Sequence, residues 1–151
     1  MNYWLFKSEP EEFSIDMLKQ VKREPWGGVR NYQARNSMRD GMQVGDLAFF
    51  YHSNCPLPGI VGICSIVSKA HVDASQFDPN SDYFDPASQP EAPRWVCVDV
   101  GFKRKLKRTI TLGELQQHAQ ALGDFALTRR GNRLSVLPVS EKQWNYILAL
   151  L

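Results

Sequence analysis

The segment formed by residues 26–36, WGGVRNYQARN, places a tryptophan beside two glycines and follows it with basic and amide side chains. A nucleic-acid base that stacks on an aromatic ring gains about 1–3 kcal/mol, so an indole in this setting could hold a planar ligand. The neighbouring glycines would let the backbone come close to that ligand. Composition alone favours the other interpretation, in which Trp26 folds inward as a lid on the core.

Polar side chains follow two apolar segments of the sequence. Lys7 and Ser8 end the first segment, and residues 52–54, HSN, end the second. A few placed polar groups at strand ends commonly orient a ligand in a pocket, so these residues could read the edge of a base. The alternative is that the serine and asparagine of the second group only form turn hydrogen bonds before Pro56.

Positive charge is concentrated in the last third of the chain. Residues 1–102 carry a net charge of −4 and residues 103–151 carry +6, although the whole chain carries only +2. Positive surface potential attracts polyanions, and each neutralised phosphate adds salt-dependent affinity. The basic run at 103–108 is equally well explained as a solvated strand edge. The arginine-rich loop at 129–133 is therefore the better candidate for phosphate binding.

Signals for catalysis or metal binding are weak. His52 and Ser53 are neighbours on one extended segment, so their side chains point to opposite faces and cannot easily form a base and nucleophile pair. The sequence has no GxSxG, HExxH, P-loop or dinucleotide-binding motif. Its three cysteines lack the spacing of a zinc site or a disulfide framework. We predict no catalytic residue, no metal and no cofactor.

The composition is typical of one soluble globular domain: 151 residues, 43% hydrophobic and 23% charged. The longest apolar runs, at 47–51 and 146–151, are far shorter than the roughly 20 residues that span a bilayer. The amino-terminal segment lacks the pattern of a signal peptide. We expect a single domain over residues 1–151, a cytosolic location and no membrane partner.

Hydrophobic patterning predicts five or more strands, of which five are placed at 3–7, 47–52, 60–67, 95–108 and 134–139. The second of these is apolar on both faces, which predicts a central strand, and it should form an antiparallel hairpin with the third. Short helices are predicted at 15–21, 32–39, 112–118 and 141–151. The predicted N-caps of the first, third and fourth are Ser14, Thr111 and Ser140. Residues 78–93, with four prolines and four acids, are predicted to form a surface loop.

Six blocks of the sequence resemble the EVE domain family. They are YWLFKSEP at 3–10, WGGVRNYQARN at 26–36, GDLAFFYHSN at 45–54, GIVGICSIV at 59–67, RWVCVDVGF at 94–102 and RLSVLPVSEKQW at 133–144. The blocks follow the order of the family and cover nearly the whole chain. The resemblance implies an α+β, PUA-like fold related to the YTH domain. Such a fold is a curved mixed sheet or small β-barrel of five to six strands with short flanking helices.

The resemblance also implies a base-binding cleft, and it raises the ligand-binding interpretation of Trp26 above that of a core lid. A second aromatic wall is expected from Tyr32, Tyr51 or Trp95. The predicted pocket consists of Lys7, Ser8, Trp26, Val29, Asn31, Tyr32, Tyr51, His52, Ser53, Asn54, Trp95 and Ser135. The predicted phosphate contacts are Arg30, Arg129, Arg130 and Arg133.

The function expected from this resemblance is that of a non-enzymatic reader of nucleic acid. Its ligand would be a modified base, of the 5-methylcytosine type in DNA or a modified base in RNA. One alternative is an enzyme that acts on a nucleotide or small heterocycle, with His52 as acid or base. Another is a protein-interaction module that uses the loop at 78–93.

The expected location follows from the first strand, which begins at the start of the sequence. Eukaryotic nuclear relatives have a basic amino-terminal extension before that strand. We therefore expect a bacterial, cytoplasmic protein that acts as a monomer.

Overall fold

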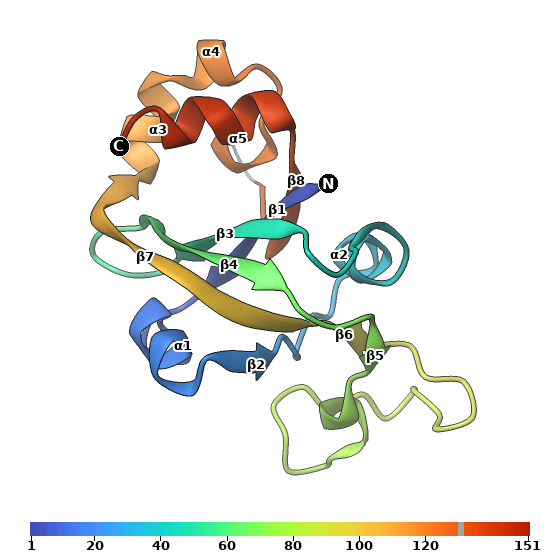
Figure 1. Ribbon diagram of the computed structural model, residues 1–151. Coiled ribbons are helices and arrows are strands. Elements are labelled where there is room, and N and C mark those ends of the chain that lie inside the picture. The colour runs from blue at the N-terminus through green and yellow to red at the C-terminus, as the bar shows by residue number, and fades with distance from the viewer. Residues whose placement is uncertain (130–131) are drawn as a thin grey trace.

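A curled six-stranded sheet forms the centre of the computed structural model, which describes residues 1–129 and 132–151 (Figure 1). Its strands are β1 (Tyr3–Ser8), β2 (Arg23–Pro25), β3 (Leu47–His52), β4 (Gly59–Ile66), β7 (Asp99–Thr111) and β8 (Val136–Val139). Their order is β2-β7-β4-β3-β1-β8, and only the β1–β3 pair is parallel. The predicted α+β class and the predicted curved mixed sheet are confirmed. A separate two-stranded sheet pairs β5 (His71–Val72) with β6 (Val96–Cys97).

The sheet buries apolar side chains on both faces because its central strands alternate between two cores. Leu5 and Phe49 belong to one buried cluster, whereas Phe6 and Phe50 belong to the other. These residues are fully buried, as expected for strands that are apolar on both faces. The central position of β3 and its antiparallel hairpin with β4 were both predicted correctly.

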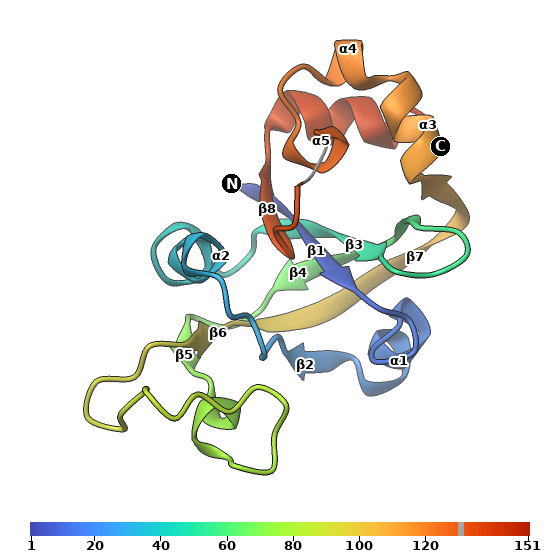
Figure 2. The ribbon, with the colours of Figure 1, turned by 180° about the vertical axis from the view of Figure 1, so that it is seen from behind.

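Short helices cover the two faces of the sheet (Figures 1 and 2). One face is covered by α3 (Leu112–Gln117), α4 (Ala119–Leu122) and α5 (Glu141–Leu148), and the other by α1 (Ile15–Val21) and α2 (Tyr32–Asn36). The predicted caps are present: Ser14 caps α1, Thr111 caps α3 and Ser140 caps α5. The prediction of one α-helix over 32–39 is wrong in part. The α-helix α2 ends at Asn36, and a π-helical turn follows over Ser37–Gly41.

The acidic, proline-rich segment is a loop, as predicted, and it is ordered around one buried amide. Gln76 lies in a 3₁₀ turn (Ala74–Phe77) and is fully buried. Its Nε2 donates to the carbonyl oxygens of Asp73 (2.6 Å) and Trp95 (2.7 Å), and its Oε1 accepts from Ser88 Oγ (2.6 Å). One side chain therefore fixes both ends of the loop by satisfying buried backbone groups. None of the helices within the described residues is long and apolar enough to cross a membrane.

The cap of α5 provides a test of the fold. Ser140 Oγ accepts from the backbone N–H of Gln143 (3.1 Å), and Gln143 Oε1 accepts from that of Ser140 (2.9 Å). We expect Ser140→Ala to lower the free energy of unfolding by about 1 kcal/mol, because an orphan N–H of the first turn loses its partner. Urea denaturation measures this loss. Lys142→Ala, an exposed change in the same turn, is the matched control and should leave the midpoint unchanged.

Candidate base-binding site

A cavity of about 620 Å³ opens where the ends of several elements meet. The elements are the end of β1, β2 with the segment that follows it, the approach to β8, and the loop after Gln76. Such a volume suits a small planar ligand with part of its polymer. The cavity is lined by Lys7, Ser8, Glu9, Glu12, Phe13, Glu24, Pro25, Trp26, Gly27, Gly28, Val29, Ser53, Asp82, Tyr83, Arg133 and Ser135.

Trp26 is at once part of the core and a wall of this cavity. Only 8% of it is exposed, and its ring packs against Phe6 (5.0 Å between centroids), Phe50 (5.4 Å) and Phe13 (6.2 Å). Its backbone N–H donates to the carbonyl oxygen of Val98 (2.8 Å), which extends the β2–β7 pairing by one bond. The core-lid interpretation of Trp26 was therefore correct for its burial, and the residue also lines the cavity.

Tyr83 is a second aromatic wall that sequence reasoning missed. The residue is 39% exposed and lines the cavity from the acidic loop. Its ring lies against Gly28, where an added Cβ would stand 2.8 Å from the ring and where φ is +80°. Only glycine adopts that backbone freely and leaves room for the ring. The second glycine of the WGG motif thus makes space for a protein side chain, which the motif alone could not reveal.

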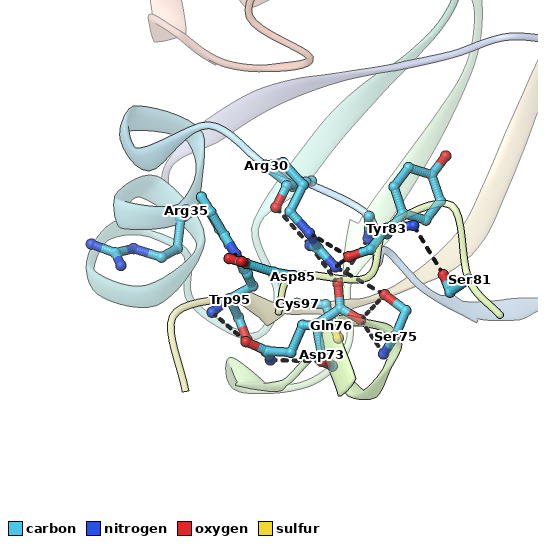
Figure 3. Close-up of polar contacts among 12 residues, drawn as sticks. Arg30, Arg35, Asp73, Ser75, Gln76, Ser81, Tyr83, Asp85, Trp95 and Cys97 are labelled. Atoms are coloured by element: carbon cyan, nitrogen blue, oxygen red, sulfur yellow. Dashed lines mark hydrogen bonds and ion pairs between the residues drawn. The ribbon is translucent and has the colours of Figure 1, made fainter. Parts of the chain in front are cut away.

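Arg30 holds the backbone of Tyr83 in place (Figure 3). Its Nε and Nη2 donate to the carbonyl oxygen of Tyr83 (3.0 and 2.8 Å), and its Nη1 forms an ion pair with Asp73 Oδ2 (3.0 Å). Nη2 also donates to Ser75 Oγ (3.1 Å). The prediction that Arg30 contacts phosphate is not supported, because the guanidinium is already engaged by these acceptors.

Tyr32 and Trp95 form a column with two arginines instead of lining the cavity. The two rings stack with centroids 4.9 Å apart; Arg35 lies 4.6 Å from the Tyr32 ring and Arg30 lies 5.4 Å from the Trp95 ring. Trp95 Nε1 donates to Asp85 Oδ2 (2.7 Å). The expectation that either ring forms the second wall is therefore corrected. Trp95 packs against Arg30, the arginine that positions Tyr83, and Tyr32 stacks on Trp95.

The carboxylate of Asp73 joins the two segments that flank the cavity. It accepts from the backbone N–H of Gly28 (2.8 Å), from Arg30 and from Ser75 Oγ (2.6 Å). Burial by itself raises the pKa of Asp73, but the bonds from Ser75, Gly28 and Arg30 together outweigh burial, so the pKa lies below its ordinary value. The ionised form is thus the one that the folded state favours.

Five of the predicted polar residues meet in the cavity: Lys7, Ser8, Ser53, Ser135 and Arg133. Backbone bonds bring their segments together, since Lys7 N–H donates to Ser135 O (2.8 Å) and Ser53 N–H donates to Ser8 O (3.0 Å). Burial lowers the pKa of Lys7, which is partly buried. Val29 also lines the cavity, as predicted.

Four other predicted pocket residues lie elsewhere. Tyr51 is buried in the opposite core, where burial above all, with a smaller effect of Cys55, raises its pKa to about 12. His52 Nε2 accepts from the backbone N–H of Ile15 (3.1 Å). The remaining two act locally: Asn54 donates to Glu9 Oε1 (2.6 Å), and Asn31 caps α2. Successive residues of a strand point to opposite faces, so the block FYHSN could not place all its side chains in one pocket.

The lining contains more acidic groups than the sequence suggested. Glu9, Glu12, Glu24 and Asp82 all contribute, and they come from three separate segments. Arg129, a predicted phosphate contact, lies 3.5 Å from Asp124 with both side chains largely exposed. Arg130 lies outside the described residues. Within the described residues, no cluster of three or more His, Cys, Asp or Glu side chains could hold a metal ion.

The fold and the site define an α+β domain in which a curled, mixed six-stranded sheet borders a cavity with two aromatic walls. The profile of the EVE domain family matches residues 2–150, so the chain belongs to the EVE domain family. It is 46% identical to thymocyte nuclear protein 1 of Mus musculus, over 99% of this chain and 73% of that protein.

Solved structures support the same assignment. A crystal structure of a Pseudomonas syringae protein is 49% identical with a TM-score of 0.94, and the match covers 98% of each chain. The human THYN1 protein, crystallised in complex with DNA containing 5-methylcytosine, is 43% identical with a TM-score of 0.94, over 99% of this chain and 97% of that one. The Mmi1 YTH domain shares the fold at 10% identity, with a TM-score of 0.52.

The charge on Asp73 predicts a pH-dependent contribution to stability. We expect Asp73→Asn to lower the free energy of unfolding by about 1–3 kcal/mol at neutral pH, because bonds to a charged group are replaced by neutral ones. A carboxyl whose pKa is depressed on folding stabilises the protein fully above its unfolded pKa of about 3.9 and loses that contribution in more acid solution.

Denaturant titrations of the wild type and of Asp73→Asn, between neutral pH and a pH of about 3, measure the difference between their free energies of unfolding. The contributions of the other acids are common to both proteins and cancel in this difference. The difference in free energy of unfolding should be constant at higher pH and should become smaller below a pH of about 4. A gap that stays the same size into acid would contradict the role given to the Asp73 charge.

Proposed function

We propose that this chain is a non-enzymatic reader that binds a modified base of nucleic acid in the cavity walled by Trp26 and Tyr83. The 5-methylcytosine class in DNA is the ligand favoured, since the human relative was crystallised with DNA that contains this base. The observation that carries the proposal is an aromatic wall on each of two separate segments of one cavity lining. We also propose that residues 1–151 act as one such domain.

The energetics of base capture fit this cavity. Moving a base out of a duplex costs a few kcal/mol, and stacking on aromatic rings returns about 1–3 kcal/mol per base. Trp26 is held rigidly by three aromatic neighbours, so little conformational entropy is lost when a base stacks on it. A buried methyl group adds only about 0.8 kcal/mol, so selectivity for the modification depends on how closely the methyl fits.

Polar groups of the lining would fix the position of the nucleotide. Lys7, Ser8, Ser53 and Ser135 are the candidates for contacts with the base edge or the sugar. Arg133 is exposed in the lining, and Arg129 is exposed four residues before it. These two arginines are our candidates for phosphate contacts, since the interior carries more acids than bases.

No catalytic step belongs to this proposal. His52, which the enzyme hypothesis needs as acid or base, does not line the cavity, and its Nε2 accepts from the Ile15 N–H. The interaction-module hypothesis keeps one supporting observation, the partial exposure of Tyr83 and Phe84 on the acidic loop. Because Tyr83 is fixed by Arg30 and faces the cavity, the loop is better explained as part of the base-binding site.

The second wall tests this function without disturbing the core. We expect Tyr83→Ala to weaken binding of an oligonucleotide that contains 5-methylcytosine by about 5- to 100-fold, because one stacking surface is lost. Fluorescence anisotropy measures the affinity, and thermal unfolding should show an unchanged midpoint.

Phe84→Ala is the matched control. Phe84 is 40% exposed, against 39% for Tyr83, and lies outside the lining. Equal affinities of the two variants would count against the cavity as the binding site. Trp26→Ala is less informative, because removing a buried tryptophan also costs about 3–5 kcal/mol of stability.

A further inference from the structure

Glu24 stands beside Trp26 on the same face of an extended segment. In the segment from 23 to 26, Arg23 and Pro25 are exposed, whereas Glu24 is partly buried and Trp26 is buried. This alternation is that of a strand, in which residues two apart point to the same side. Glu24 is fixed in register opposite Val100 of β7, so its backbone is as firmly placed as that of the tryptophan.

The carboxylate of Glu24 has no hydrogen bond or ion pair within residues 1–129 and 132–151, although it lines the cavity. The other acids of the lining differ from it. Glu9 accepts from Asn54, Glu12 is exposed with Oε2 3.5 Å from the Tyr83 hydroxyl, and Asp82 is exposed. Glu24 is therefore the one partly buried acid of the lining whose acceptor atoms are free among the described residues.

A free carboxylate next to a stacking surface discriminates between base edges. A carboxylate only accepts hydrogen bonds, so it pairs with the exocyclic amino group of a cytosine and meets the keto oxygen of thymine with repulsion. The donors of the lining come from other elements: Lys7 and Ser8 end β1, and Ser135 precedes β8. They suit the acceptor atoms that remain on a cytosine edge, its N3 and O2.

We propose that Glu24 is the specificity-determining residue of this cavity, which accepts a hydrogen bond from the 4-amino group of a 5-methylpyrimidine and excludes its 4-keto counterpart. The proposal rests on the proposed function and adds to it the edge of the base that is read. The methyl group is common to 5-methylcytosine and thymine, so contacts with the methyl cannot separate these two bases. The amino edge must do so.

The test compares two probes that differ only at that edge. Wild-type protein and Glu24→Gln are titrated with single-stranded oligonucleotides that carry one central 5-methylcytosine or one thymine at the same position. Single strands remove the cost of opening different base pairs. We expect the wild type to prefer 5-methylcytosine by about 10- to 100-fold, and we expect Glu24→Gln to reduce this ratio to about 1, because an amide can donate to the keto oxygen.

Glu11→Gln removes an exposed acid that lies outside the lining and is the matched control; it should keep the wild-type ratio. An unchanged ratio in Glu24→Gln, with 5-methylcytosine still bound tightly, would overturn the role of Glu24 and leave the proposed function standing. Failure of the wild type to bind the 5-methylcytosine probe would overturn both. A circular dichroism spectrum identical to the wild type establishes that Glu24→Gln is folded.

Discussion

The ion pair between Arg30 and the buried carboxylate of Asp73 is the interaction on which the geometry of the cavity depends. It connects the segment after β2 to the loop between β5 and β6, two parts of the chain separated by 43 residues. Both partners are largely withdrawn from water, with 21% and 5% of their side chains exposed. A buried charge without its partner is strongly destabilising, so the two segments are held as a unit. Tyr83 takes its place through the same arginine.

One residue, Trp26, belongs both to the core and to the cavity lining, so a substitution there would alter both. Trp26 packs its ring against Phe6 and Phe50 in the core, and it also lines the cavity. The stiffness needed for stacking therefore comes from the same contacts that stabilise one side of the sheet. Sites built on strands and packed side chains hold their geometry more closely than sites on free loops.

The acidic and the basic side chains of the site suit different parts of a nucleic-acid ligand. The lining contains more carboxylates than basic side chains; Arg133 is an exposed member of it, and Arg129 is exposed four residues earlier in the chain. Acidic groups in the interior disfavour phosphate there and accept hydrogen bonds from amino groups of a base. A polyanion attracted to the arginines would thus keep its backbone outside and present only a base to the aromatic walls. The nearly neutral total charge conceals this division.

The sequence by itself indicated five of the six strands of the main sheet, three helix caps and the family, because hydrophobic alternation and capping residues act over a few neighbouring positions. It missed the three-residue strand β2, which is defined by its pairing with β7. It also identified Trp26, Lys7, Ser8 and Ser135, which belong to contiguous motifs. Tertiary structure alone decided that Tyr83 and not Tyr32 lines the cavity, and that Arg30 pairs with Asp73. The physical reason is that these outcomes depend on contacts between residues more than 40 positions apart in the sequence. Local spacing rules do not specify which distant acceptor an arginine will bind.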